Sequence, residues 1–383
     1  MIIELIKAQR RNKGMFKSNL LKVNFLKVFT ISKNFKLFLI LTLPFLTQFS
    51  CNTTEPTDDI KPGRRDYVWS IDSISGPGVP YLQSIWGSSP TDVWGAGFSE
   101  DVRNCLWHFD GVSWKRATEG TPITELGNGS KIVGGVWGTA QNDVWAFGGR
   151  IFSNPLSSEP FIMHYDGNQW TEVLGDKSQM PDGFTDIYPI RKDHFWISSS
   201  DHVSEYKDGI WNKYFIGGNY YVQSIEGIGN SVYLTTYPIG VDSLFIMKLI
   251  NENFLPIDYS SLFGAGKFGH LAISFTQNEI YTFDEYGIYQ AEMIGEIIST
   301  ETWQITVQSN AGGFGNTLKL SNKNIWAVGN NQFPYHYNGS NWQPIDMYFN
   351  LVPVSGNVFW GIWGNEEEIF FCDVENGIIY HGK

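Results

Sequence analysis

The sequence predicts an all-β protein, a seven-bladed β-propeller in which four-stranded blades form a ring around a channel. Three observations predict this fold. A motif of roughly 45 residues recurs seven times, each copy divides into short β-favouring runs separated by turns, and the spacing between anchor residues is nearly constant. A unit of this size cannot bury both faces of its sheet alone, so neighbouring units must pack radially.

The first copy defines the motif. It contains Ser-Ile-Trp86-Gly, then Asp92-Val-Trp94-Gly, then His108-Phe-Asp-Gly-Val-Ser-Trp114. In repeats one to seven the first-strand anchors are Trp86, Trp137, Tyr188, Glu226, Ser274, Leu318 and Trp363, and the second-strand anchors are Trp94, Trp145, Trp196, Tyr233, Tyr281, Trp326 and Phe370. The two anchors of each repeat are always seven or eight residues apart. Of the 15 tryptophans, only Trp107 and Trp360 lie outside the repeat positions and Trp69.

The two ends of the chain predict how the ring closes. Repeat seven stops after a third strand at Ile379 to His381, whereas Asp66 to Asp72, around Trp69, reads as a fourth strand without a preceding three. We expect this N-terminal strand to complete the last blade, because pairing the two ends removes an exposed sheet edge.

The beginning of the chain has the pattern of an export signal. Nine Lys and Arg residues precede an uncharged stretch, residues 37–49, which is followed by Ser50 and Cys51. Such a stretch suits a signal peptide and is too short to span about 30 Å of hydrocarbon. We predict a lipoprotein-type signal peptide at 1–50, a lipid on Cys51 that anchors the protein to the outer membrane or cell surface, a flexible tether at 51–65 and a propeller at 66–383. Ordinary cleavage and an uncleaved anchor are the alternatives.

Charge and motif content exclude several functions. Of 27 basic and 39 acidic residues, nine basic ones but only one acidic one precede Cys51, so the rest of the chain carries a net charge of −20. A surface this negative repels nucleic acid. No CxxC, HExxH, calcium-loop or nucleotide-binding glycine pattern is present, so we expect no metal and no cofactor. Cys105 and Cys372 are expected to be two free buried thiols.

The repeat resembles a known group of proteins. The pattern WG…DVWAVG…HYDGxxW, read from residues 86–114, 137–170 and 318–342, resembles the propeller repeats of bacterial secreted and surface proteins, similar to Kelch-like and Asp-box propellers. The resemblance implies the fold. It says little about function, because such propellers serve as binding proteins, scaffolds and, in a minority, enzymes.

The conspicuous repeated residues have structural interpretations. His108, His164 and His336 recur at one position, which indicates a repeat contact and not a metal site. Asp92, Asp143 and Asp193 precede second strands, where a carboxylate can accept hydrogen bonds from turn amides. We expect Trp86, Trp137 and Trp363 to pack between neighbouring blades.

Function is expected where the repeats differ. The second-to-third-strand loops are unequal and emerge on one face, with the longest predicted at Gly149 to Pro160. The candidate binding residues on this face are Phe98, Arg103, Arg150, Phe152, Tyr220, Tyr221, Tyr237 and Tyr348. The leading hypothesis is a monomeric, non-enzymatic module that binds a protein or a glycan. The alternative is a carbohydrate-active enzyme, a glycosidase, lyase or glycosyl transferase, that uses Asp186 and Glu226 at the mouth of the channel.

Overall fold

The computed structural model divides the chain into two units, Met1–Asp59 and Ile60–Lys383. It describes residues 61–383 apart from 75–80, 100–104, 125–129, 154–155, 218–219, 239–244, 258–271, 285–286, 309–312, 331–332, 348–357 and 374–376. The predicted signal peptide, Cys51, Arg103 and Tyr348 therefore lie outside the described residues.

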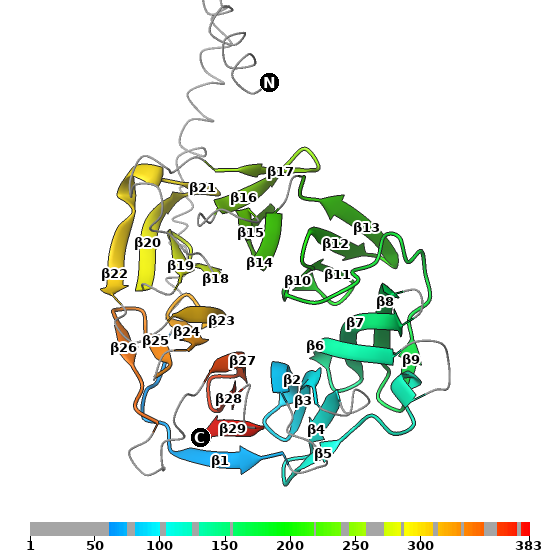
Figure 1. Ribbon diagram of the computed structural model, residues 1–383. Coiled ribbons are helices and arrows are strands. Elements are labelled where there is room, and N and C mark those ends of the chain that lie inside the picture. The colour runs from blue at the N-terminus through cyan, green and yellow to red at the C-terminus, as the bar shows by residue number, and fades with distance from the viewer. Residues whose placement is uncertain are drawn as a thin grey trace, which may run out of the picture. The chain divides into compact units, whose positions relative to one another are not determined.

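Antiparallel sheets stand side by side in a ring, and each runs outward from an innermost strand (Figure 1). Repeats one and two supply β2 (Tyr81–Ser89), β3 (Asp92–Phe98), β4 (Leu106–Phe109) and β5 (Trp114–Arg116), then β6 (Ser130–Ala140), β7 (Asp143–Ser153), β8 (Leu156–Tyr165) and β9 (Trp170–Glu172). Repeats three and four supply β10 (Asp186–Arg191), β11 (His194–Ser198), β12 (His202–Lys207) and β13 (Ile210–Phe215), then β14 (Tyr220–Ile228), β15 (Ser231–Pro238), β16 (Phe245–Ile250) and β17 (Asn253–Pro256).

Repeats five to seven continue the pattern. They supply β18 (Ala272–Phe275), β19 (Glu279–Phe283), β20 (Gly287–Ile294), β21 (Ile297–Ile298) and β22 (Gln304–Gln308), then β23 (Phe314–Ser321), β24 (Asn324–Gly329), β25 (Tyr335–Tyr337) and β26 (Trp342–Pro344), then β27 (Phe359–Gly364), β28 (Ile369–Asp373) and β29 (Ile378–Gly382). In the described part of the chain, two short 3-10 helices, η2 (Pro122–Thr124) and η3 (Thr300–Thr302), lie between strands. The arrangement is an all-β propeller of four-stranded blades. A single pair, Gly97 with Val133, joins the sheets of repeats one and two, so the described residues form six hydrogen-bonded sheets.

The strand β1 (Trp69–Ser73) lies beside the C-terminal strand β29, with Trp69 opposite Gly382 and Ser73 opposite Ile378. The Trp69 ring stacks on Phe371 with their centroids 5.3 Å apart. Residues 61–65, predicted as part of the tether, are also held against the ring. The Gly63 amide donates to the Lys323 carbonyl at 3.0 Å, and the Arg65 guanidinium donates to the His336 carbonyl at 2.7 Å.

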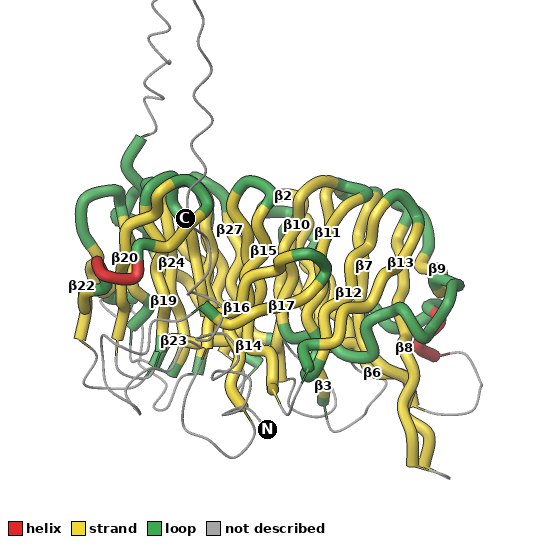
Figure 2. Tube along the Cα trace, turned by 90° about the horizontal axis from the view of Figure 1, so that it is seen from above, coloured by secondary structure: helices red, strands yellow, loops and turns green. Residues whose placement is uncertain are grey.

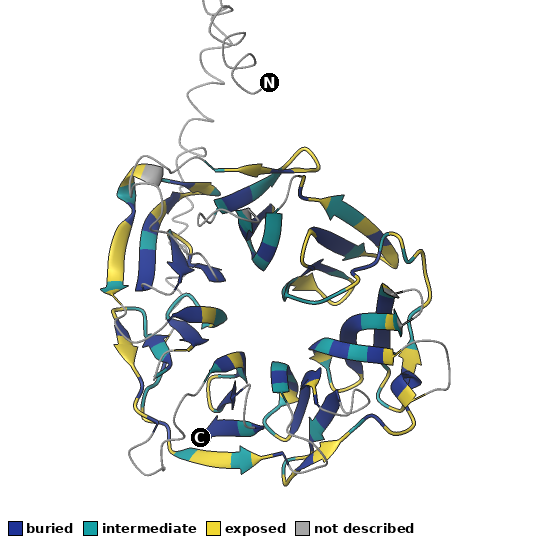
Figure 3. Ribbon diagram, viewed as in Figure 1, coloured by how far each residue is buried: buried dark blue, intermediate teal, exposed yellow. Residues whose placement is uncertain are grey.

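The Trp-Gly dipeptide of the repeat is explained by the packing between neighbouring sheets. The ring of Trp363 lies against Gly87 of repeat one, and the ring of Trp86 lies against Gly138 of repeat two. A Cβ at Gly138 would be 2.7 Å from the Trp86 ring, so only glycine leaves room for it. The prediction that Trp86 and Trp363 pack between blades is confirmed. Buried residues fill the middle of the sheets, and the outermost strands carry many of the exposed ones (Figure 3).

Each repeated histidine is hydrogen-bonded to a residue at the start of the neighbouring strand of its own sheet. The pairs are His108 with Asp92 at 2.6 Å, His164 with Asp143 at 2.7 Å, His336 with Asn324 at 2.9 Å and His381 with Glu368 at 2.6 Å. The predicted repeat contact is confirmed, but the Asp92 and Asp143 carboxylates bind side chains, not the turn amides that we expected. Ser88 and Thr139 hydroxyls supply the second donor.

Repeat three reverses this pair and corrects the sequence alignment. His194, not Asp193, occupies the position equivalent to Asp92, and it bonds to Glu205 at 2.8 Å. Asp193 instead pairs with Arg191 at the turn. The histidine and the carboxylate have exchanged positions, so the contact is kept although the residue types at both positions differ from those in repeat one. A sequence alignment does not detect this.

The turn between the third and fourth strands of repeat five reaches into repeat four. Its tip, between β20 and β21, places Glu296 where the carboxylate accepts from the Asn230 amide at 2.9 Å and from the Ser231 hydroxyl at 2.5 Å. Lys248 donates to the Glu296 carbonyl at 2.8 Å. Ser231 and Lys248 occupy the two positions that hold Asp92 and His108 in repeat one, so repeat five completes the polar contact that repeat four has lost.

The segment from Gly149 to Pro160 is not the loop that we expected. It forms the outer part of a long hairpin in which Gly149 pairs with Pro160 and Phe152 pairs with Ser157. This hairpin of β7 and β8 projects from the lower edge of the ring (Figure 2). The segment contains glycine, asparagine and proline, which are depleted in ordinary strands and favour a loop.

Two further expectations concern cysteines and membranes. Cys105 and Cys372 are both buried and neither forms a disulfide, as predicted. Within the described part of the chain, no helix has both the length and the apolar character needed to cross a membrane.

Candidate functional site

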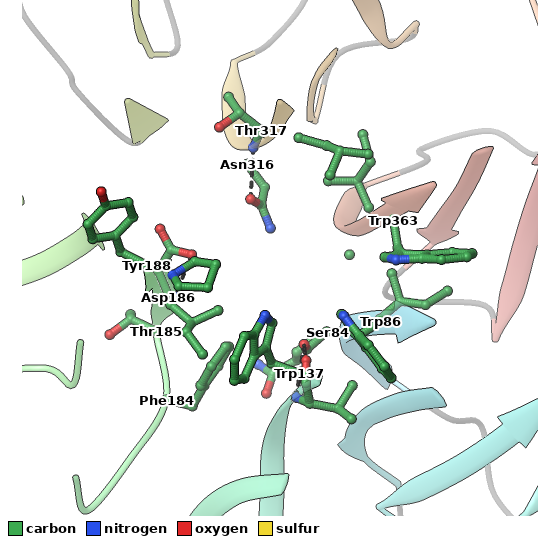
Figure 4. Close-up of a pocket in the computed structure, with 18 of the residues that line it drawn as sticks. Ser84, Trp86, Trp137, Phe184, Thr185, Asp186, Tyr188, Asn316, Thr317 and Trp363 are labelled. Atoms are coloured by element: carbon green, nitrogen blue, oxygen red, sulfur yellow. Dashed lines mark hydrogen bonds between the residues drawn. The ribbon is translucent and has the colours of Figure 1, made fainter. Parts of the chain in front are cut away.

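A cavity of about 500 Å³ lies in the middle of the ring (Figure 4). Its wall is built from the innermost strands of six repeats, β2, β6, β10, β14, β23 and β27. Three tryptophans, Trp86, Trp137 and Trp363, form one part of the wall, and Asp186, Glu226, Lys319 and Tyr188 belong to the rest. This size is within the range of sites for small ligands.

The two parts of each indole ring in this wall, the benzo part and the part that carries the N–H group, have different surroundings. The benzo ends of Trp363 and Trp86 rest on Gly87 and Gly138 of the following repeats. The nitrogen-bearing side of each of the three indole rings faces the middle of the cavity (Figure 4). Trp137 is only 8% exposed. The packing that explains the repeat thus also brings three N–H donors to one space.

Asp186 links two repeats. One of its oxygens accepts from the Ile187 amide at 2.8 Å, and the other accepts from the Ile225 amide of repeat four at 3.1 Å. Ser84 and Asn316 occupy the equivalent position, two residues before the first anchor, and likewise bond to the next repeat, at Val136 and Trp360. Asp186 therefore has a structural role in addition to its place in the cavity wall.

Burial raises the pKa values of both cavity carboxyls. For Asp186 the pKa is raised to about 7, against the effect of its two amide donors and with a further contribution from the charge of Glu226. For Glu226 burial also raises the pKa to about 7, opposed by the Gly227 amide and by Lys319. Burial lowers the pKa of Lys319, and the charge of Glu226 acts in the opposite direction. Near neutral pH the two carboxyls can each give or accept a proton.

These shifts predict a pH-dependent difference in stability. A carboxyl with a raised folded-state pKa holds its proton more tightly when folded, so its contribution to stability is full below about pH 4 and is lost as the pH rises to about 7. The variant Asp186→Asn/Glu226→Gln cannot titrate there. We expect its free energy of unfolding, measured in urea, to rise relative to wild type between pH 5 and pH 7.5.

The comparison with wild type is needed because other groups titrate in the same window. Burial lowers the pKa of His336 to about 3, which makes stability increase with pH in both proteins. A stability difference between variant and wild type that stays constant from pH 5 to pH 7.5 would contradict the assignment to Asp186 and Glu226.

The predicted aromatic contacts lie at the edge of the ring from which the second-to-third-strand connections emerge. Phe98, at the end of β3, is 41% exposed and stacks on Tyr81 with centroids 4.9 Å apart. Tyr221 and Tyr237 stack in the same way in repeat four, at 5.3 Å. Both are cross-strand pairs at equivalent positions, five residues before the first anchor and four after the second. Tyr220 lies beside this second pair, with its ring edge-on to Phe245.

Arg150, one of the candidate binding residues, is held in ion pairs within repeat two. Its guanidinium binds Glu159 at 2.7 Å and Glu172 at 2.9 Å, and Lys177 also contacts Glu159 at 2.7 Å. The cross-strand pairing of the hairpin creates this network, which balances the charge of Arg150 within repeat two. Phe152 lies farther out on the same hairpin and is half-buried.

The cavity donors were missed in the sequence analysis. Trp86, Trp137 and Trp363 fit the repeat, so their periodicity indicated packing and not a site. Trp360 lies outside the repeat positions, but it is not among the residues that line the cavity. It is 46% exposed on the innermost strand β27. Among the described residues, no group of three or more His, Cys, Asp and Glu side chains is placed to hold a metal ion.

Comparisons with known proteins define the fold class. No family model and no curated protein matches the chain. Solved structures do match. YCF48 bound to D1 peptide is similar over 84% of this chain and 98% of its own, with 15% identity and a TM-score of 0.56. The WD40 propeller domain of Doa1 is similar over 84% and 97%, with 10% identity and a TM-score of 0.56.

A third similar structure comes from a bacterial two-component system. The extracellular domain of a putative hybrid two-component system from B. thetaiotaomicron matches 82% of this chain, with 13% identity and a TM-score of 0.58, but the match covers 39% of that chain. At such identities these likenesses show the fold alone. The described unit is a β-propeller.

Proposed function

We propose that this protein is an exported, non-enzymatic binding module that holds a partner protein at the aromatic edge of its ring. The edge is defined by Phe98 with Tyr81 and by Tyr221 with Tyr237. The observation that carries the proposal is the exposure of Phe98, which adds an apolar ring to a position where the repeats do not need one. Exposed aromatic side chains are typical anchors of protein interfaces. The similar YCF48 structure, bound to D1 peptide, agrees with a peptide or protein ligand.

Site-specific cross-linking tests this proposal. A photo-reactive phenylalanine analogue at position 98 or 237 is expected to cross-link one discrete protein in the cell of origin. The same analogue at Val112, 87% exposed in the turn between β4 and β5, is the matched control and should give no such product. Without the analogue, Phe98→Ser/Tyr237→Ser should reduce recovery of the same partner in a pull-down by about tenfold, without lowering the melting temperature. Equal cross-linking from position 112 would contradict the proposal.

We infer further that the ring has seven blades and that the N-terminal strand completes the last one. The joined sheet of repeats one and two divides naturally at the single Gly97–Val133 pair, which supports two blades there. The five paired residues of β1 and β29 support closure by the strand around Trp69. A ring closed in this way needs no partner for its edges, so we expect a monomer.

The anchoring hypothesis is that residues 1–50 are a lipoprotein signal peptide and that Cys51 carries the lipid. The ring would then reach the outer membrane or the cell surface on a tether that ends near residue 60. Cys51→Ser is expected to move the protein from the membrane fraction to the soluble exported fraction, with an unchanged circular dichroism spectrum. Fractionation that stays the same would favour an uncleaved hydrophobic anchor.

A carbohydrate-active enzyme is the second proposal, because Asp186 and Glu226 line one cavity and both have a pKa near 7. A general acid benefits from such a value. Both oxygens of Asp186 accept hydrogen bonds from backbone amides, so Glu226 is the better candidate for proton transfer. Hydrolysis of an aryl glycoside that is lost in Glu226→Gln would support this activity.

A further inference from the structure

We propose that the central cavity binds a short neutral saccharide. This site is separate from the aromatic edge, so the inference does not rest on the proposed protein partner. The cavity wall brings hydrogen-bond donors, hydrogen-bond acceptors and aromatic surface together in about 500 Å³.

The donors are the three indole N–H groups. They face the middle of the cavity (Figure 4), and within the described part of the chain no acceptor is hydrogen-bonded to them. Trp137 is the most informative of the three, because more than nine-tenths of its surface is buried and its N–H side still points into this space. Its nitrogen is not one of the fully buried polar atoms without a partner in the described residues, so the N–H is open to the cavity and can donate to a ligand or to water there.

The acceptor is the Glu226 carboxyl, and Lys319 supplies a further donor. One oxygen of Glu226 accepts from the Gly227 amide at 3.0 Å, and the other has no hydrogen-bond donor among the described residues. Lys319 lies in the same wall and acts on Glu226 through its charge, and no hydrogen bond joins its ammonium group to another described residue. Both groups can therefore bind a molecule in the cavity.

The combination favours a neutral polyhydroxylated ligand over an ion. The cavity wall has two carboxyls, Asp186 and Glu226, but one ammonium group, Lys319, so it repels an anion. The net negative charge of the chain adds to this repulsion. A quaternary cation would need the faces of the aromatic rings, whereas these indoles present their N–H edges. Sugar hydroxyls can accept from indole N–H groups and donate to a carboxylate, while the sugar C–H surface contacts the apolar parts of the rings.

The test uses the full chain and an array of neutral and acidic glycans, followed by calorimetric titration of the neutral glycan that is retained. Trp137→Phe removes the N–H and keeps an aromatic ring. We expect it to weaken binding at least tenfold, with a cooperative melting transition like that of wild type. Trp342→Phe is the matched control, because its indole N–H is buried in the sheet of repeat six and does not line the cavity. Its affinity should equal that of wild type.

Three results would overturn the inference. They are an array on which no neutral glycan is retained, retention of acidic glycans alone, and equal affinity of Trp137→Phe and wild type. Should Trp137→Phe fail to fold, Glu226→Gln provides a second test, since it keeps the size of the side chain and removes its charge. The affinity of this variant should fall, and it should change less between pH 5 and pH 8 than that of wild type, because Asp186 and Lys319 remain in the same wall. Cross-linking at position 98 would be unaffected in every case, which separates this site from the aromatic edge.

Discussion

Deletion of residues 61–73 is expected to abolish cooperative unfolding and to cause aggregation. The deletion removes β1, the five residues that pair with β29, and it removes the Trp69 ring that stacks on Phe371. It also removes Tyr67, which is buried in the same cluster and meets Trp326 edge-on at 5.7 Å. Loss of one such buried aromatic side chain costs about 3–5 kcal/mol, against a net stability of about 5–15 kcal/mol.

The unpaired edge adds to this loss. Without β1, the N–H and C=O groups of β29 are exposed, and such an edge recruits other strands. Thermal unfolding followed by circular dichroism, with light scattering, measures both effects. Deletion of residues 52–60 is the control, because it shortens the chain by a similar number of residues and keeps every described contact. A 61–73 deletion that melts with the control would mean that the ring is complete without this strand.

Much of the fold could be predicted because repetition multiplies a weak local signal. One Trp-Gly dipeptide means little, but two anchors seven or eight residues apart recur in every copy. The spacing is kept because the two anchors are cross-strand partners, as Trp86 and Trp94 are in repeat one. The hairpin of β7 and β8 escaped prediction for the opposite reason. It occurs once, and cross-strand contacts such as Arg150 with Glu159 become visible only when two strands are in register.

The candidate site was less predictable, because its chemistry depends on the direction in which each side chain points its polar atoms. The sequence identified Asp186 and Glu226 as channel carboxyls, and both line the cavity. It could not show that Asp186 is bonded to Ile225 of the next repeat, since that contact joins residues 39 positions apart. Nor could it show that the N–H edge of Trp137 faces the cavity. A periodic pattern indicates that a side chain packs, but it does not say which of its atoms remain available.

Gly138→Ala is expected to destabilise the ring by about 2–3 kcal/mol, at the upper end of what overpacking costs. The new Cβ would lie 2.5 Å from the Asp143 carbonyl oxygen and 2.7 Å from the Trp86 ring. The carbonyl belongs to the backbone at the start of β7, so it cannot move aside without disturbing the strand pair. The Trp86 ring would have to move away from position 138, and the contact between the two repeats would weaken. Urea unfolding measures the change.

Gly183→Ala is the matched control, because a Cβ there would meet no atom within 4 Å, and its stability should stay within about 0.5 kcal/mol of wild type. The double variant Trp86→Ala/Gly138→Ala identifies the clashing partner. If the indole is the obstacle, the double variant should be less destabilised than the sum of the single variants by at least about 0.5 kcal/mol. Additive effects would place the whole clash on the Asp143 carbonyl. A Gly138→Ala variant as stable as Gly183→Ala would show that the Trp-Gly dipeptide is retained for a reason other than the space that glycine leaves.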